Sequence, residues 1–350
     1  MTRPIAHRDA IMAIPAVLPA VEVVESTIAS PSIASIVGRE FELPAPQQCS
    51  FLAGGFNDNY DLRLPDGRRF IARLSKFRPR GGPNIPFEAA LLEHLAREGI
   101  AVAAANRTRQ GNWSVPVPTP EGIRDLVLFH HLQGRPPGND LDAIHATGRG
   151  LARIHASACH YAGPASTYRL DLDHLLWKPL SRIASLGHID TDLKTRFQCI
   201  GTSVAERLAG LSLTQVICHG DCHGGNNFVG ADADGTLVAR FFDFDDSGPG
   251  YQAYDLAVFL WGQLFRGSHT SLTVDIERAW QAFIDGYRSI GEIRATDLGA
   301  VSDFVAARML WYVGEYAGNI HKLGTRHIGP AWFQRIADLL EQWRELDIAG

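Results

Sequence analysis

Acidic and amide side chains cluster in the Gly-rich segment from Cys218 to Asn226, and further acidic residues follow downstream. Asp221 and Asn226 are five residues apart, on a loop that follows a strand ending near Ile217. Asp243 stands where a second apolar strand ends, so its carboxylate can project into a cleft. Magnesium in proteins prefers oxygen ligands, usually one or two carboxylates completed by phosphate oxygens and water. We therefore predict Asn226 and Asp243 as magnesium ligands, with the carboxylate of Asp221 beside them.

The same segment also admits plainer interpretations. Four residues of zinc-binding type lie within six positions: Cys218, His219, Cys222 and His223. Most structural zinc sites use two separated ligand pairs, so we interpret the two cysteines as buried, small apolar side chains. Taken singly, Asp221 and Asp243 could be turn or capping residues. Their combination with Asn226 and with the neighbouring apolar strands favours the chemical interpretation.

Hydrophobic periodicity and turn signals indicate the elements that must position these residues. Strand patterns occupy residues 50–52, 60–64 and 69–74, and Pro65-Asp66-Gly67 forms a tight turn between the second and the third. Gly54-Gly55 lies in the first connection. The pattern predicts a three-stranded antiparallel meander whose first loop is rich in glycine.

A helix that Pro86 opens follows the meander, and residues 126–129 are expected to form a short buried strand. The clearest linker in the chain is Gly134-Arg135-Pro136-Pro137-Gly138. Beyond it helical patterns dominate, interrupted by short strands at 227–229 and 237–242. The sequence thus predicts a small β-rich lobe, a linker and a larger helical lobe, with a ligand cleft between the lobes.

Protein kinases use an Asp and an Asn at the separation of Asp221 and Asn226; the Asp accepts the hydroxyl proton and the Asn holds magnesium. The motif His219-Gly220-Asp221-x-His223-x-x-Asn226, with Asp243-Phe244-Asp245 and Asp255-Leu256-Ala257 after it, resembles the aminoglycoside phosphotransferase and choline kinase family. Homoserine kinase type II and the bacterial stress-response serine/threonine kinases belong to the same group. The resemblance covers roughly residues 45–345. It implies an α+β, protein-kinase-like bilobal fold, ATP and Mg²⁺ as cofactors, and Asp221 as the catalytic residue.

The resemblance also assigns residues around the nucleotide. Gly54, Gly55 and Asn57 resemble the loop that covers it. Arg73, at the end of the third strand, occupies the position usually held by a phosphate-binding lysine. Glu88, on the next helix, resembles the acid that pairs with that cation. Arginine is a wider, planar donor than lysine, but both can neutralise the α- and β-phosphates.

Two further assignments concern the base and the catalytic loop. Residues 129–132, which include Phe129 and His131, resemble the hinge whose backbone binds adenine. Asp255 resembles a structural acid that braces the catalytic loop. Two purely structural interpretations stay open. Gly54-Gly55 also suits an ordinary hairpin turn, and Glu88 also suits a solvated position near a helix N-terminus.

The predicted division of the chain follows from these roles. Residues 1–25 are expected to form a loosely ordered N-terminal arm. Residues 26–133 are expected to form the N-terminal, nucleotide-binding lobe, which has a small antiparallel sheet. Residues 134–350 are expected to form the mostly helical C-terminal lobe, which carries catalysis and acceptor binding.

The acceptor is constrained by what lies after Asp243. Only a short stretch separates it from the helix near Tyr254, where eukaryotic-type protein kinases carry a long activation segment and an Ala-Pro-Glu motif. This difference favours a small hydroxylated acceptor over a peptide. Asp245 and Asp246 could bind a cationic acceptor or a second metal, or could cap the following loop. Three further residues lie at helical spacing near the C-terminus: Trp311, Tyr312 and Glu315. This spacing suggests that they pack in the core, and a role facing the acceptor is the alternative.

Three functions therefore compete. The first is an ATP-dependent phosphotransferase that moves the γ-phosphoryl group to an alcohol of a small molecule, such as an amino alcohol, a homoserine-like compound, a sugar or an aminoglycoside. The second is a serine/threonine protein kinase of the bacterial stress-response type. The third is a non-catalytic nucleotide-binding pseudokinase, which the joint presence of Asp221, Asn226 and Asp243 disfavours.

Composition limits the partners. The 350 residues carry a net charge of −5, which provides no basic surface for nucleic acid or for an anionic membrane. No run of residues reaches the roughly 20 apolar positions of a membrane span. The odd number of cysteines, five, without a secretory signal favours reduced thiols and a cytoplasmic location.

Overall fold

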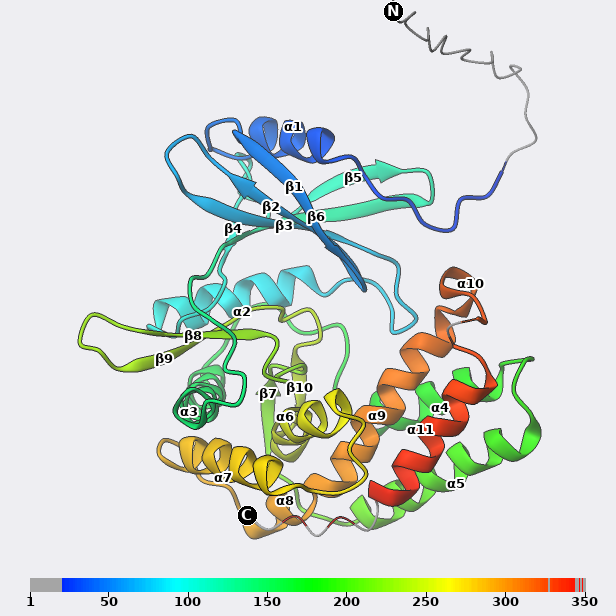
Figure 1. Cartoon of the computed structure of the whole chain (residues 1–350). Helices are drawn as coiled ribbons and strands as arrows, with labels where there is room; N and C mark the ends of the chain where they lie inside the picture. Colours follow the sequence, from blue (N-terminus) through cyan, green and yellow to red (C-terminus); the bar gives the residue numbers. More distant parts are fainter. Residues whose placement is uncertain (1–20, 327, 344–345, 347, 349–350) are drawn as a thin grey trace, which may run out of the picture.

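The computed structural model describes residues 21–326, 328–343, 346 and 348. Figure 1 shows a sheet-containing lobe at one end of the molecule and a larger, mostly helical lobe at the other. Most of the predicted N-terminal arm, residues 1–20, lies outside the described residues, and residues 21–25 carry no helix or strand. The chain crosses between the lobes in the segment that links strand β6 to helix α3, and the predicted linker Gly134–Gly138 lies there.

The N-terminal lobe is built on an antiparallel sheet in the order β1-β2-β3-β6-β4, with β5 also paired to β6. The predicted meander is confirmed, because β2 pairs with both β1 and β3. The buried strand expected at 126–129 is longer in the structure and forms a hairpin with β5, an edge strand that tolerates two prolines. The strands are β1 (Gln48–Gly54), β2 (Asn57–Arg63), β3 (Arg69–Ser75), β4 (Ala105–Asn106), β5 (Val115–Thr119) and β6 (Gly122–His130).

Two helices flank this sheet on opposite faces. Helix α1 (Ser30–Glu40) buries Ile33 and Val37 against the outer face, in a small core with the strand residue Tyr60. Helix α2 (Ile85–Arg97), which Pro86 opens as predicted, lies between the sheet and the second lobe in Figure 1. Its leucines belong to the large core that continues into the C-terminal lobe. Helix α2 therefore couples the two lobes.

The C-terminal lobe is mostly helical and holds two short antiparallel strand pairs. Strands β8 and β9 are the predicted pair, whereas β7 and β10 pair with each other across a long connection. The elements are α3 (Leu141–Ala158), the π-helical turn η1 (Asp173–Trp177), α4 (Lys178–Ala184), α5 (Thr191–Leu208), β7 (Gln215–Cys218), β8 (Asn227–Ala231), β9 (Leu237–Phe241), β10 (Gly248–Tyr251), α6 (Gln252–Arg266), α7 (Val274–Arg288), α8 (Ala295–Gly299), α9 (Val301–Gly318), α10 (Ile320–Leu323) and α11 (Pro330–Trp343).

Helices α3 and α7 pack unusually closely, because glycines face backbone on both sides. A Cβ atom on Gly148 would lie 1.9 Å from the carbonyl oxygen of Phe283, and one on Gly286 would lie 2.0 Å from that of His145. Only glycine permits this approach. In Figure 1, α7 lies beneath α3, and both helices lie below the strand pair β8–β9.

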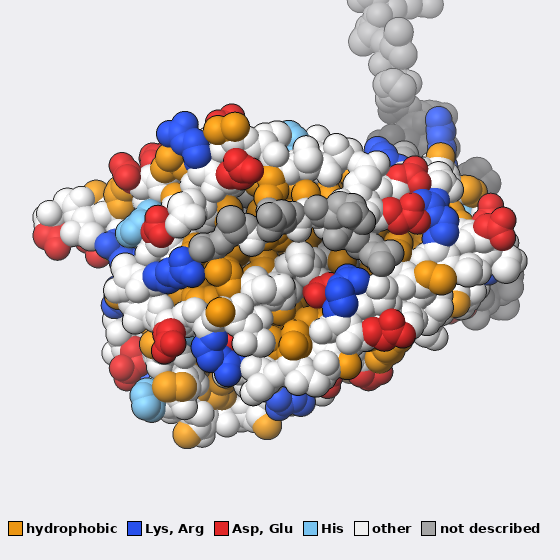
Figure 2. Space-filling view, turned by 90° about the horizontal axis from the view of Figure 1, so that it is seen from below, with side chains coloured by type: hydrophobic (Ala, Val, Ile, Leu, Met, Phe, Trp, Pro, Cys, Tyr) orange, Lys and Arg blue, Asp and Glu red, His pale blue; other side chains and the backbone are white. Residues whose placement is uncertain are grey.

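The surface agrees with the modest net charge. In Figure 2, acidic and basic side chains alternate across the face on view, and no basic patch extends over it. Within the described residues, no helix has the length and apolar character that a membrane crossing requires.

Candidate active site

The catalytic loop between β7 and β8 is held by a buried carboxylate at the start of α6. Asp255 accepts hydrogen bonds from the backbone N–H groups of His219 (2.7 Å) and Gly220 (2.8 Å). His155 of α3 lies 2.9 Å from the same carboxylate through Nε2, and the Tyr287 hydroxyl lies 2.8 Å from its Nδ1. The bracing contact that the sequence predicted for Asp255 is therefore present. Such charge-assisted bonds in a dry interior fix the loop firmly.

Gly220 has a backbone conformation that only glycine suits here. Its φ is 85°, and a Cβ atom would lie 2.1 Å from the carbonyl oxygen of Asp246. The buried ring of His219 stacks on Phe244 with centroids 4.2 Å apart, and its Nδ1 accepts from the backbone N–H of Asp221 at 3.2 Å. The motif residues before Asp221 thus turn the chain so that the carboxylate of Asp221 points out of the loop.

The carboxylate of Asp221 accepts hydrogen bonds from two side chains within the described residues, and the Nε2 atom of His223 lies 3.7 Å from it. The Nδ2 group of Asn226 donates to its carboxylate at 2.9 Å and to its carbonyl oxygen at 3.0 Å. Arg308, from the middle of α9, donates to the other carboxylate oxygen. Burial by itself would raise the pKa of Asp221, but Arg308, with smaller contributions from His223 and His219, holds that pKa below its usual value. Asp221 is therefore a fixed, ionised carboxylate.

Asp243 follows β9 and adopts a left-handed backbone conformation with φ of 64°. Residues other than glycine seldom adopt it, although aspartate tolerates it better than most. The side chain is 44% exposed, toward the cleft, and lies 3.6 Å from the guanidinium of Arg73. Burial between the lobes and the nearby carboxylates raise the pKa of Asp243 to about 7, although Arg73 opposes the shift. This is a carboxylate placed where a cation would stabilise its charge.

Arg73 and Glu88 form a buried, bidentate ion pair between β3 and α2. The two guanidinium nitrogens donate to the two carboxylate oxygens at 2.8 and 2.5 Å, and both side chains are at most 6% exposed. The pairing predicted for these two residues is confirmed, and the solvated alternative for Glu88 is excluded. Arg73 also lies over the ring of Phe129 at 4.8 Å. The pair fixes one positive charge in the cleft.

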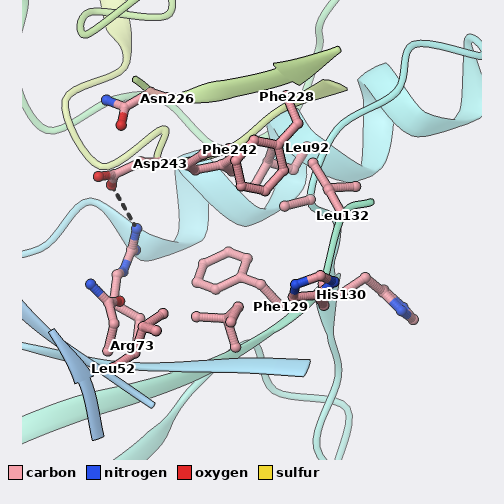
Figure 3. Close-up of a pocket in the computed structure, with 14 residues that line it drawn as sticks. Leu52, Arg73, Leu92, Phe129, His130, Leu132, Asn226, Phe228, Phe242 and Asp243 are labelled. Atoms are coloured by element: carbon pink, nitrogen blue, oxygen red, sulfur yellow. Dashed lines mark ion pairs between the residues drawn. The ribbon is translucent and has the colours of Figure 1, made fainter. Parts of the chain in front are cut away.

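A cavity of about 330 Å³ lies between the lobes and ends at these charged residues. Figure 3 shows Arg73 and Asp243 linked at one side, with the side-chain oxygen of Asn226 directed toward Asp243. The hinge residues Phe129 and His131 line the cavity as well. The rest of the wall is mainly apolar, with Leu52, Ile71, Leu92, Ala103, Leu132, Phe228 and Phe242. A mainly apolar cavity with charged residues at one end fits a base joined to phosphates.

The β1–β2 turn, to which the sequence assigned a nucleotide-covering role, contributes none of its predicted residues to the wall of this cavity. Gly54, Gly55 and Asn57 are outside the residues that line this cavity, whereas Leu52 and Asn59 from the same strands line it. The reason is that the turn reaches across to the helical lobe. The side chain of Asn57 donates to the carboxylate of Asp245 at 3.0 Å. A nucleotide-covering role for the two glycines stays a prediction.

Asp245 and Asp246 are not free carboxylates. Arg78 and Arg80, from the segment after β3, both form ion pairs with both of them, at 2.9 to 3.0 Å. Both aspartates are at most 6% exposed. The sequence left open whether these two aspartates bind a cationic ligand or cap the following loop. In the structure they instead belong to a buried cluster of arginines and aspartates.

Of the remaining candidates, Trp311 and Glu315 are buried, whereas Tyr312 is only partly buried. Glu315 pairs with Arg78 and Arg182, and Trp311 donates its ring N–H to His174 at 3.2 Å. Cys218 and Cys222 are buried thiols, and burial raises the pKa of both. In the part of the chain that the structure describes, no three His, Cys, Asp or Glu side chains gather as a metal site.

Sequence reasoning missed Arg308. This residue is 3% exposed, and its guanidinium lies over the rings of Trp311 at 4.3 Å and Trp261 at 4.9 Å. Its signal in the sequence is an arginine within an otherwise apolar and aromatic stretch of α9, residues 304–313. A charge that is buried so deeply needs a partner, and here the partner is Asp221.

Comparison with known proteins connects this site to a family. The sequence matches the model of the phosphotransferase enzyme family over residues 48–293. An uncharacterized protein of Deinococcus radiodurans is 31% identical over 322 residues, which cover 91% of each chain. A homoserine kinase of Rhodopseudomonas palustris is 25% identical over 263 residues, which cover 73% of this chain and 74% of that protein.

Solved structures share the fold at lower identity. An amicoumacin kinase in complex with AMP-PNP and Ca²⁺ has a TM-score of 0.73 at 19% identity, covering 92% of this chain and 96% of its own. A microcompartment-associated aminopropanol kinase has a TM-score of 0.69 at 19% identity, covering 90% and 97%. A choline kinase from Streptococcus pneumoniae has a TM-score of 0.62 at 16% identity, covering 89% and 98%. These likenesses confirm the predicted α+β, protein-kinase-like fold.

Proposed function

The chain belongs to the phosphotransferase enzyme family and is a kinase with an alcohol group as acceptor, and from this premise we propose that it moves the γ-phosphoryl group of ATP to a hydroxyl group of a small molecule. One observation carries the proposal. Arg73, Asn226 and Asp243 meet at one end of an apolar cavity, and Asp221 is hydrogen-bonded to Asn226 there. A phosphate chain that leaves the apolar slot would pass between Arg73 and Asp243 toward Asp221.

The apolar part of the cavity is our proposed adenine site. The backbone N–H groups of His130 and His131 donate to the carbonyl oxygens of Ala104 (3.0 Å) and Arg69 (3.2 Å). These bonds hold the hinge in place, so that its wall is formed before the nucleotide arrives. Preorganisation of this kind reduces the entropy that binding must overcome. Arg73, held by Glu88, would then offset the charge of the α- and β-phosphates.

Magnesium fits the donors at the other end. Asn226 uses its Nδ2 group on Asp221, so its Oδ1 atom is left for a cation, and Asp243 presents a carboxylate to the same cavity. Hard oxygen donors of this type suit Mg²⁺. When bound with ATP, the ion would offset phosphate charge during transfer.

Nucleotide binding is expected to depend on pH through Asp243. Its pKa of about 7 means that the carboxylate is protonated below pH 7 and available to a cation above it. We expect the magnesium-dependent part of ATP affinity to fall by about tenfold per pH unit below pH 7 and to level off above it. Calorimetry with and without magnesium measures this part. The Asp243→Asn variant has no titrating group at this position, so its pH dependence reports the titration of ATP alone. An equal pH dependence of ATP affinity in the variant and in the unaltered protein would contradict the assignment to Asp243.

Asp221 is our proposed catalytic residue. Its carboxylate would accept a hydrogen bond from the acceptor hydroxyl, orient the oxygen toward the γ-phosphorus and take the proton late in the transfer, because the transition state is loose. Arg308 and Asn226 hold this carboxylate in one position. A fixed orientation of the attacking oxygen is worth more than strong basicity in such a reaction.

The acceptor is proposed to be a small molecule. Between Asp243 and α6 lie only a short loop and β10, and β10 is paired with β7 inside the lobe. This arrangement leaves no extended segment there to align a peptide. A cytoplasmic location would supply ATP and magnesium to this reaction.

A coupled ADP-release assay over a panel of acceptors tests the proposal. The panel contains sugars, amino alcohols, aminoglycosides, hydroxy acids and generic protein substrates, each at matched concentration. We expect acceptor-dependent ADP release with at least one small hydroxylated compound, at a kcat in the usual range of about 1–100 s⁻¹. Release that depends only on a protein substrate would favour the protein-kinase alternative, and no release above the rate in buffer would contradict kinase function.

A further inference from the structure

The loop after Asp243 carries two carboxylates next to the site where the acceptor must reach Asp221, but neither is available to a ligand. Asp245 and Asp246 are each bound by two arginines, Arg78 and Arg80. The same arginines, with Arg73, hold the pKa of Asp245 far below its usual range, although burial opposes the shift. Asp245 therefore remains charged, and the two arginines already pair with both aspartates.

The carboxylate on α9 is compensated in the same way. Glu315 lies 2.9 Å from Arg182 and 3.3 Å from Arg78, and it is fully buried. Asp221 itself has Arg308 as its partner. Within the described part of this cluster, the charges on the acceptor side are thus arginine–carboxylate pairs. In this cluster an incoming ammonium group would meet carboxylates that already have arginine partners, and it would lie close to several guanidinium groups.

An aromatic surface adjoins these pairs. Arg308, Tyr312 and Tyr316 are spaced four residues apart on α9 and so share one face of the helix. The rings of Tyr312 and Tyr316 lie 4.6 Å apart, and both tyrosines are only partly buried. Trp261 of α6 lies 5.5 Å from Tyr312, and Phe56 of the β1–β2 turn lies 5.8 Å from Tyr316.

The aromatic surface begins beside the catalytic carboxylate and ends at the other lobe. Arg308, which binds Asp221, lies over the ring of Trp261. Burial raises the pKa of Tyr312 most, Tyr316 raises it further, and the charge of Asp221 makes a smaller contribution. Phe56 closes the far end from the N-terminal lobe. Partly exposed rings such as those of Tyr312 and Tyr316 offer apolar faces at low entropic cost, and such faces suit the C–H face of a ring rather than a compact ion.

We propose, resting on the kinase function above, that the acceptor carries no positive charge and is a ring-shaped, sugar-type polyol whose apolar face lies against Tyr312. Its reacting hydroxyl would reach Asp221. Its other hydroxyl groups would accept hydrogen bonds from Arg78 Nη2 and Arg80 Nη1, which have no hydrogen-bond partner within the described residues. This class differs from the cationic amino alcohols and aminoglycosides on which several proteins of similar fold are named to act.

Matched sugars test the charge. Glucose, galactose and mannose are compared by ADP release with their 2-amino and 2-acetamido derivatives, which keep the ring and add either an ammonium group or an uncharged amide. We expect at least one uncharged sugar to be phosphorylated with a kcat/KM at least about tenfold above that of its amino derivative. Preference for the amino sugars, for choline or for an aminoglycoside would overturn the inference and leave kinase function standing. Preference for an acyclic acceptor over every sugar would overturn it as well. Absence of ADP release with every acceptor class would contradict the kinase function itself.

Two substitutions test the ring contact. Tyr312→Ala is expected to raise the KM for the preferred sugar about tenfold without changing the KM for ATP, because only the acceptor face is removed. Tyr312→Phe keeps that face and is expected to retain a KM near that of the unaltered protein. An unchanged sugar KM in folded Tyr312→Ala would overturn the proposed contact, and so would an equal loss in Tyr312→Phe.

Discussion

Asp221→Asn is expected to lower kcat by about 10²–10⁴-fold while the protein stays folded and continues to bind ATP. The reason lies in the geometry of the loop. Asparagine keeps one acceptor oxygen for Arg308, and the backbone bonds from His219 and Gly220 to Asp255 do not involve the altered side chain. What is lost is the negative charge that orients the acceptor hydroxyl and takes its proton.

The measurement combines steady-state turnover with ATP affinity and thermal unfolding. Asp192→Asn is the matched control, since Asp192 is an exposed aspartate in the first turn of α5, far from the cleft in sequence and structure. Turnover of the control should equal that of the unaltered protein. A folded Asp221→Asn protein with near-normal turnover would remove Asp221 from the catalytic role.

Arg73→Ala is expected to weaken ATP binding and to destabilise the fold together. A charge-assisted contact to phosphate contributes about 1.5–3 kcal/mol, and each 1.4 kcal/mol corresponds to about tenfold in affinity. In addition, Glu88 would be left in the interior without its bidentate partner. Removal of one partner of a buried ion pair typically costs about 3–5 kcal/mol of unfolding free energy. Calorimetry measures the first effect and urea unfolding measures the second.

Three comparisons separate the two effects of Arg73. Arg73→Lys should recover much of the ATP affinity, because the positive charge is kept while the bidentate geometry is lost. The double variant Arg73→Ala/Glu88→Ala should be destabilised by less than the sum of the single variants, since both remove one interaction. Arg69→Ala is the control on the same strand; it breaks the half-exposed pair with Asp61 and should change stability by at most about 1 kcal/mol. Normal ATP affinity in folded Arg73→Ala would exclude the phosphate-binding role.

The fold could be predicted wherever local pattern and tertiary environment agree. The β1–β3 meander and helix α2 follow from strand alternation, turn residues and the proline at the helix start. Strand β10 could not be predicted, because its sequence, Gly248-Pro249-Gly250-Tyr251, has low strand propensity. Glycine stands in this strand because the space beside β7 is narrow: a Cβ atom on Gly250 would lie 2.7 Å from the Cβ atom of Leu170.

The site could be predicted in part for a similar reason. Asp221, Asn226 and Asp243 lie in a short motif whose spacing carries the chemistry, and the structure brings the three together. The partners of the acidic residues lie far away in sequence, as Arg78 and Asp245 are separated by 167 residues and Arg308 and Asp221 by 87. A motif does not contain this information. An arginine within an apolar helix is a sign that an acidic partner exists, but only the fold identifies that partner.

Transfer from γ-labelled ATP, followed by separation of small molecules from protein, tests the central claim most directly. The full-length protein is incubated with magnesium and with the acceptors that support ADP release, and with the Asp221→Asn protein as the blank. We predict that the label appears on the small molecule, in proportion to the ADP formed, and that the blank transfers little. Label that accumulates on protein, or that appears only as inorganic phosphate, would contradict the account.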